Sequence, residues 1–207
     1  MIEPDWRAPR GVRAFVTTRD FGDVSIANVR RLLPADPIWL KQVHGKRVVE
    51  SGVGGEADAV VSRKPGEVCA IMVADCMPVL FADDAGTIVG AAHAGWRGLA
   101  AGVLEATMDA MEVPRDKLHA WLGPAIGPQA YEVGEDVRVA FSSYPHAVVP
   151  TRPGHWLLDL YAVAHEKLKG LKSVSGGGFC TYSQPERFFS YRRDRARERM
   201  GAFVWLA

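Results

Sequence analysis

The sequence predicts an α+β fold in which mixed β-sheets are packed by a few helices. Short apolar runs rich in β-branched residues cluster in the first half of the chain and return at its end. Helical periodicity is confined to a few segments between them. Strands and helices therefore do not alternate as they would in a doubly wound parallel sheet. We expect a single domain covering residues 1–207.

Apolar runs in the first half of the chain predict the central strands. Residues 38–43 and 47–49 flank His44-Gly45-Lys46, and Gly45 permits the turn of a hairpin between them. Further runs are almost continuously apolar, as in strands buried on both faces. They predict strands at residues 68–74, 79–82 and 87–92, with a turn at 83–86.

Helical periodicity begins after these strands. From residue 98 apolar side chains recur at spacings of three and four, which predicts an amphipathic helix ending before Pro114. Asp159 caps a second predicted helix that Gly170 follows. A third covers residues 135–142, and strand patterns return at 187–191 and 201–206.

Composition excludes several classes of protein. The formal net charge is +1, from 25 basic and 24 acidic side chains, which argues against a nucleic-acid partner. No apolar run is long enough to span a membrane, and the acidic N-terminus lacks the apolar core of a secretory signal. Three cysteines do not form a disulfide framework. We expect a cytoplasmic protein, monomeric or weakly homo-oligomeric, without a membrane partner.

His44, Cys76 and His93 each stand at the end of a predicted strand, beside small or turn residues. Two imidazoles and a thiolate suit Zn²⁺, and three protein ligands leave a fourth position for water, as in catalytic zinc sites. Each residue taken alone is better explained as a buried or hydrogen-bonded group. The pattern therefore leaves three unrelated residues, a metal site and a Cys–His pair all open. Cys69 is expected in the core, and the role of Cys180 stays open.

Several motifs resemble those of the YfiH-type family, also called the polyphenol oxidoreductase laccase family and purine nucleoside phosphorylases. They run in order from about Phe15 to the C-terminus. The motifs are Lys41-Gln42-Val43-His44-Gly45, Ala57-Asp58-Ala59, Ala74-Asp75-Cys76-Met77-Pro78, Ala92-His93-Ala94-Gly95-Trp96-Arg97-Gly98, Gly123-Pro124-Ala125-Ile126-Gly127, Tyr131-Glu132-Val133-Gly134 and Phe189-Ser190-Tyr191-Arg192-Arg193.

This resemblance implies that His44, Cys76 and His93 bind zinc. It implies phosphorolysis of adenosine, inosine, guanosine and methylthioadenosine, together with deamination of adenosine, in a cytosolic enzyme. The fold of the family is similar to that of a bacterial toxin with a Cys–His deamidase site.

Other residues are assigned by the chemistry that these reactions need. Deamination needs a nucleophilic water of lowered pKa, which zinc provides, and a proton shuttle. Asp75 and Asp58 are placed for such a contact, although a turn or capping role fits Asp58 equally well. Phosphorolysis needs a phosphate site, for which Arg97, Arg192 and Arg193 are candidates because a guanidinium matches phosphate oxygens.

Three other interpretations use the same residues. Cys76 and His93 could act as a hydrolase pair on peptidoglycan precursors, which a chelator would not inhibit. Phenol oxidation with copper is the second, but laccase chemistry needs roughly ten histidine ligands and the chain has 6. The third is a binding module whose zinc only supports the fold. A fourth protein ligand would favour it, and the remaining histidines are His119, His146, His155 and His165.

The chain departs from the family pattern in three places. Residues 20–37 are shorter than in relatives, which puts the substrate range in doubt. Gln129-Ala130 stands where many relatives have cysteine, and Arg197-Glu198 replaces a Thr-Gly pair. None of these changes falls on a proposed zinc ligand.

Overall fold

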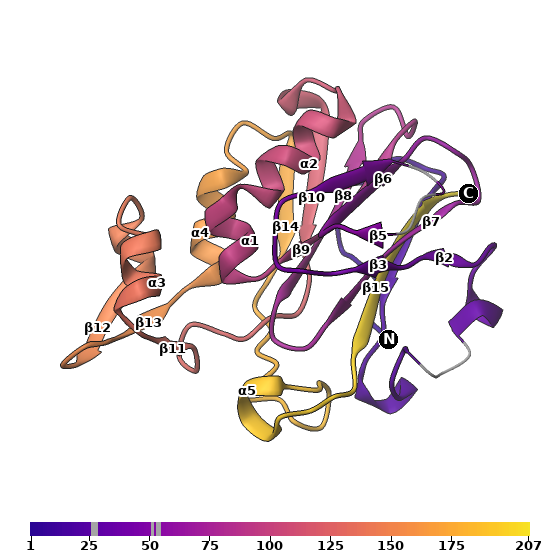
Figure 1. Cartoon of the computed structure of the whole chain (residues 1–207). Coiled ribbons are helices and arrows are strands. Elements are labelled where there is room, and N and C mark those ends of the chain that lie inside the picture. Colours follow the sequence, from indigo (N-terminus) through magenta and orange to yellow (C-terminus); the bar gives the residue numbers. More distant parts are fainter. Residues whose placement is uncertain (26–28, 51, 53–54) are drawn as a thin grey trace.

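The computed structural model describes residues 1–25, 29–50, 52 and 55–207. Two large mixed sheets lie face to face, and helices cover the outer face of the second sheet (Figure 1). The first sheet has the order β1 (Val12–Val16), β15 (Met200–Leu206), β7 (Val68–Val73) and β2 (Pro37–Ile38). The second has the order β14 (Ser173–Gly176), β10 (Leu118–Leu122), β8 (Met77–Asp83), β9 (Val89–Ala94), β6 (Ala59–Ser62) and β4 (Val48–Glu50). The predicted α+β class is confirmed.

The central strands are buried on both faces, which explains their continuous apolar sequences. Along β8, Val79 and Phe81 pack toward the helices while Leu80 and Ala82 pack toward the first sheet. Cys69 is fully buried between the two sheets, as expected, and burial raises the pKa of its thiol. The predicted strands at 68–74, 79–82 and 87–92 are confirmed as β7, β8 and β9.

The helices on the second sheet are α1 (Trp96–Ala101), α2 (Val103–Met111) and α4 (Leu160–Lys167). The single helix expected from residue 98 is divided, because Gly102 adopts a left-handed conformation with φ of 93° between α1 and α2. The Asp159 cap is confirmed, since its side chain accepts a hydrogen bond from Ala162 N at 3.0 Å.

A small sheet projects from the body of the molecule in Figure 1. It contains β11 (Glu132–Val133), β13 (His155–Leu158) and β12 (Val148–Arg152), and α3 (Glu135–Ala140) packs on it. The remaining elements are short: β3 (Leu40–Lys41), β5 (Gly55–Glu56), α5 (Tyr191–Asp194), and 3-10 turns at Arg19–Phe21, Val29–Leu32, Arg115–Lys117 and Pro145–Ala147. In the described part of the chain, no helix combines the length and apolarity that a membrane crossing requires.

Two sequence predictions are wrong. Residues 38–49 do not form a hairpin, because β3 pairs in parallel with β5 while β4 pairs in parallel with β6. Residues 187–191 do not form a strand: Phe188 is buried without strand pairing, and Ser190 instead caps α5 by accepting a hydrogen bond from Arg193 N. The predicted C-terminal strand is confirmed as β15.

Candidate metal centre and adjoining cavity

The structure brings His44, Cys76 and His93 together. One potential ligand atom from each residue lies within 4.8 Å of the others, and no other such group of metal-binding side chains occurs among the described residues. The His44 side chain is exposed, Cys76 is half-buried and His93 is buried. The cluster can therefore hold a metal ion that is anchored in the protein on one side and accessible on the other.

Strand register explains how residues so far apart in sequence meet. Pro78 pairs with His93 and Met77 with Ala94, so Cys76 continues the register opposite Gly95. A Cβ on Gly95 would lie 2.7 Å from Cys76 Sγ and 3.4 Å from His44 Cδ2. Because real Cβ atoms do not approach this closely, only glycine leaves room for the three ligands to converge.

Asp58 connects both histidines. It precedes β6, where Ala59 pairs with Ala92, and its carboxylate Oδ1 lies 2.8 Å from His93 Nδ1. The carboxylate also accepts hydrogen bonds from the backbone N–H groups of Val43, His44 and Gly45, at 3.2, 2.9 and 2.7 Å. These bonds hold His44 at a φ of 62°, which is unfavourable for a non-glycine residue.

The fully buried Asp58 thus acts as a clamp between two segments of the chain. Since an ionised carboxylate only accepts hydrogen bonds, His93 Nδ1 donates to it and leaves Nε2 for a metal. Burial opposes ionisation of Asp58, but the hydrogen bonds from His93 and Gly45 outweigh it and lower its pKa. The turn at residues 43–45, which was predicted to be part of a hairpin, is therefore held by hydrogen bonds to the buried carboxylate of Asp58.

Without a metal, Cys76 and His93 form a charged pair. Burial alone would raise the pKa of the Cys76 thiol, but the charge of His93 and hydrogen bonds from His44 and His93 lower it to about 6. Burial opposes the charged form of His93, yet Cys76 and Asp58 raise its pKa to about 9. The thiolate that a metal requires is therefore favoured near neutral pH.

A cavity of about 650 Å³ opens beside the cluster, a size typical of small-molecule sites. Its lining combines the residues of the candidate metal centre with cationic and aromatic side chains. The lining residues are Leu40, Lys41, Gln42, His44, Met72, Ala74, Asp75, Cys76, His93, Gly95, Trp96, Arg97, Ile126, Tyr131, Leu160, Tyr191, Arg192 and Arg199. Of the residues assigned to catalysis, substrate binding or metal binding from the sequence, Asp58 and Arg193 are not in this lining.

The three candidate arginines have different surroundings. The Arg97 guanidinium stacks 4.8 Å from the Trp96 ring centroid and makes no hydrogen bond within the described residues. Arg192 stacks 5.0 Å from the Tyr131 ring centroid, and its Nη1 donates to Glu132 O at 2.7 Å. Both guanidinium groups retain donors that can reach the cavity.

Arg193 is instead bonded within the protein. Its Nη1 donates to Thr181 O and Tyr182 O, at 2.6 and 3.0 Å, and its Nη2 donates to Phe188 O at 2.9 Å. Nη2 also pairs with Asp194 at 3.0 Å. These contacts join the loop before α5 to α5 itself.

Asp75 attaches the same C-terminal segment to the sheets. Its Oδ1 accepts a hydrogen bond from Thr181 Oγ1 and its Oδ2 accepts one from Arg192 N, both at 2.6 Å. The φ of Asp75 is 86°, so this carboxylate is presented by a strained turn between β7 and β8. Asp75 lies in the cavity lining and also joins two of its walls.

Sequence reasoning missed Tyr131 and Arg199 as cavity residues. Tyr131 is the first residue of the motif Tyr131-Glu132-Val133-Gly134, which resembles one of the family's motifs. This motif could have indicated that Tyr131 belongs to the site. Arg199 lies in a run of charged residues that resembles a solvated surface, and for this reason no role in a cavity was assigned to it.

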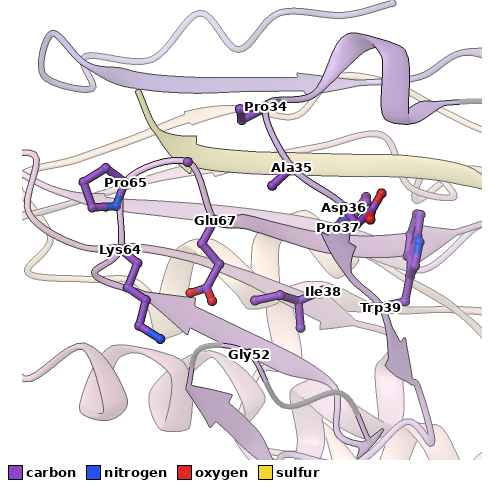
Figure 2. A pocket seen from close by; sticks show the side chains of 11 residues that line it. Pro34, Ala35, Asp36, Pro37, Ile38, Trp39, Gly52, Lys64, Pro65 and Glu67 are labelled. Carbon is purple, nitrogen blue, oxygen red and sulfur yellow. The ribbon is translucent and has the colours of Figure 1, made fainter.

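Another cavity of about 650 Å³ lies at the opposite end of β7 (Figure 2). Its lining includes Pro34, Trp39 and Glu67, and Glu67 precedes β7 whereas Cys76 follows it. A six-residue strand spans roughly 20 Å, so this cavity is separate from the metal-binding cluster.

Comparison with known proteins assigns the chain to a family. The family model described as multi-copper polyphenol oxidoreductase laccase matches residues 23–207. The chain belongs to this family. A Pseudomonas aeruginosa member named purine nucleoside phosphorylase is 49% identical and aligns over 99% of this chain and 98% of its own length. The Escherichia coli purine nucleoside phosphorylase YfiH is 44% identical, over 100% of this chain and 98% of its own.

Solved structures of family members share the fold. A Neisseria meningitidis protein superimposes with a TM-score of 0.90 at 41% identity, covering 99% of this chain and 98% of that one. YlmD from Geobacillus stearothermophilus superimposes with a TM-score of 0.85 at 26% identity, covering 97% and 96%. The expected YfiH-like fold is confirmed.

Proposed function

We propose that the protein is a zinc-dependent purine nucleoside phosphorylase. The observation that carries the proposal is the convergence of two imidazoles and a thiolate on a cavity that is also lined by three arginines, Arg97, Arg192 and Arg199. Relatives aligned over nearly the whole chain bear the name of this activity. The proposed substrates are adenosine, inosine, guanosine and methylthioadenosine with phosphate, and the proposed location is the cytoplasm. We further propose a monomer or weak homo-oligomer.

The donor set of the cluster fits zinc. Two histidines and one cysteine match the ligand types of catalytic zinc sites, and the exposed side of His44 leaves a fourth position open. Gly95 provides the space for convergence, and Asp58 selects the His93 nitrogen that faces the site. When bound, zinc would supply a Lewis acid and lower the pKa of coordinated water.

Arg97 and Arg192 are the proposed phosphate ligands. Both line the cavity, and a planar guanidinium pairs with two phosphate oxygens at once. Arg193, whose guanidinium is bonded to backbone carbonyl groups, supports α5 and thereby positions Arg192. Asp75 orients the same segment through Arg192 N.

Adenosine deamination is a second proposed activity of the same site. It needs a group that moves a proton between water and the purine. Asp75 is the better candidate, because it lies in the cavity lining whereas Asp58 is outside it. Asp58 is assigned to positioning the two histidines.

The test is incubation of the purified protein with adenosine or inosine, with and without phosphate, followed by separation of the products. Phosphorolysis predicts free base and ribose-1-phosphate only when phosphate is present. Deamination predicts inosine from adenosine without phosphate. A protein that carries zinc and yields none of these products would refute the proposal.

A hydrolase that uses Cys76 and His93 directly is the competing candidate, favoured by their proximity in the cluster. A chelator distinguishes the two, because zinc removal abolishes phosphorolysis and leaves a Cys–His hydrolase active. Oxidation of phenols by several copper ions has less support, since only two of the 6 histidines belong to the cluster.

A further inference from the structure

Tyr131 places a phenol in the cavity beside the metal-binding cluster. It lies immediately before β11 and is anchored by its backbone, whose carbonyl oxygen accepts a hydrogen bond from Leu158 N at 3.0 Å. The Arg192 guanidinium covers its ring. The backbone of Tyr131 is therefore fixed by Leu158 and its ring by Arg192, and the residue lines the proposed substrate space.

The Tyr131 hydroxyl differs from that of Tyr161, a buried tyrosine that follows the lining residue Leu160 and lies outside the cavity lining. The Tyr161 hydroxyl accepts a hydrogen bond from Ala125 N and contacts the carbonyl oxygens of Gly123 and Phe179 as a donor. Within the described residues, the Tyr131 hydroxyl makes no hydrogen bond to protein. The hydroxyl of a half-buried residue that lines a cavity, without a hydrogen-bond partner among the described residues, is available to a ligand.

The surroundings keep this hydroxyl protonated. Burial raises the pKa of Tyr131, and the negative charges of Cys76 and Asp75 raise it further, against the opposing effect of Arg192 and Arg97. Tyr131 therefore remains a hydrogen-bond donor throughout the neutral range and does not act as a base.

Phosphorolysis of a purine nucleoside creates a need for such a donor. The bond between sugar C1′ and purine N9 breaks, its electron pair moves onto the purine, and a phosphate oxygen forms a new bond to C1′. Negative charge spreads over the purine ring, including N7, an acceptor on the imidazole part of the ring. In the net equation the proton gained by the free base comes from hydrogenphosphate, so a donor to N7 is not consumed.

We propose that the Tyr131 hydroxyl donates a hydrogen bond to N7 of the departing purine and is a catalytic residue. This inference rests on the proposed phosphorylase function. The bond strengthens as charge develops on the ring, so it stabilises the transition state more than the bound nucleoside.

The test compares two nucleosides in Tyr131→Phe, which retains the ring and its stacking with Arg192. Inosine has a free N7, and the variant should lose about 100-fold in kcat with little change in KM, the effect of removing one such donor. In 7-methylguanosine N7 is alkylated and positively charged, so the base departs without a donor and both proteins should cleave it equally fast. Tyr144→Phe, which removes a hydroxyl between α3 and the 3-10 turn at Pro145–Ala147 and outside the cavity lining, is the matched control and should leave both rates unchanged.

Melting temperature and zinc content, measured on the same samples, should be equal in wild type and Tyr131→Phe. Unchanged inosine turnover in the variant would overturn the proposal. Equal losses on inosine and 7-methylguanosine would also overturn it, because a structural defect does not distinguish the two substrates. If the wild-type protein cleaves neither nucleoside with phosphate, the proposed function itself fails, a result separate from any property of the variant.

Discussion

The two sides of the cavity are built in different ways. The metal-binding side is formed by strand ends inside the sheets, where Asp58 is completely buried and joins both histidines. The opposite side is formed by residues 179–199, whose only regular element is α5, four residues long. This C-terminal wall is attached to the sheets through Asp75, and Arg193 joins its own segments to one another.

This difference separates the two tasks of the site. Metal ligands need fixed positions, which strand register and a buried carboxylate provide. The cationic groups that would contact phosphate lie on an exposed surface, where a few hydrogen bonds determine their positions. Substitutions on the metal-binding side should therefore abolish activity, whereas those on the C-terminal wall should change substrate binding.

The largest expected effect is that of Cys76→Ala. Loss of one of the three proposed protein ligands should remove bound zinc and reduce phosphorolysis at least about 1,000-fold. Metal analysis of the purified variant and a phosphate-dependent assay measure both. Cys69→Ala is the matched control, since Cys69 lies between the sheets, and should keep full zinc occupancy. A Cys76→Ala protein with one zinc per chain would show that the ligand set is wrong.

Asp58→Asn should have the next largest effect. An amide cannot accept all the hydrogen bonds that this carboxylate receives, so zinc affinity should fall about 10- to 100-fold. The free energy of unfolding should fall by about 1–3 kcal/mol at neutral pH. Zinc titration and urea unfolding measure the two quantities.

The pH dependence of Asp58→Asn provides a further check. Because the pKa of Asp58 is lower in the folded protein than its ordinary value of 3.8, its stabilising effect is complete above that pH and lost as the pH falls further. The difference between wild type and variant should therefore shrink below pH 3.8. The exposed Asp116→Asn should match wild type throughout, and equal stability of Asp58→Asn at neutral pH would disprove the clamp.

We expect smaller effects when an arginine of the cavity lining is replaced, either Arg192→Ala on the C-terminal wall or Arg97→Ala across the cavity. Each variant should retain zinc and raise the KM for phosphate. Loss of a charge-assisted pair with phosphate corresponds to about a 10- to 100-fold change. Initial rates at varied phosphate concentration measure this effect, with the exposed Arg10→Ala as control. Loss of zinc from either variant would contradict the division between the two sides.

Thr181→Val should have the smallest effect. It removes the hydrogen bond to Asp75 while keeping the shape of a fully buried side chain. We expect a loss of about 1 kcal/mol in the free energy of unfolding and a smaller rise in KM than for Arg97→Ala. Urea unfolding and phosphate titration test this, and a complete loss of activity would mean that the C-terminal wall does more than bind substrate.

The same contrast determined how much could be predicted from the sequence. Strands β7, β8 and β9 were recognisable because burial on both faces requires continuous apolar runs. The sequence prediction placed Cys76 after β7, as observed, but β9 extends beyond its predicted end and includes His93. The family resemblance favoured a metal site among the alternatives. The predicted hairpin around His44 was wrong because the backbone N–H groups of Val43 and Gly45 bond to the Asp58 side chain. Hydrophobic periodicity contains no information on such a contact.

The C-terminal wall was less predictable. Arg192 and Arg193 are neighbours of identical type, and only the three-dimensional contacts show that one lines the cavity while the other bonds to backbone carbonyl groups. Tyr131 is brought to the site by the loop before β11 and not by a strand end. Long-range hydrogen bonds between irregular segments determine this side, and a sequence pattern carries no direct record of them.

The central claim is that one zinc ion is held by His44, Cys76 and His93 with a fourth position open. X-ray absorption spectroscopy at the zinc edge tests it most directly on the purified protein. We predict one sulfur ligand at about 2.3 Å, two imidazole nitrogens at about 2.0–2.1 Å and one further light-atom ligand that is not imidazole. A spectrum that requires two sulfurs or three imidazoles would contradict the account.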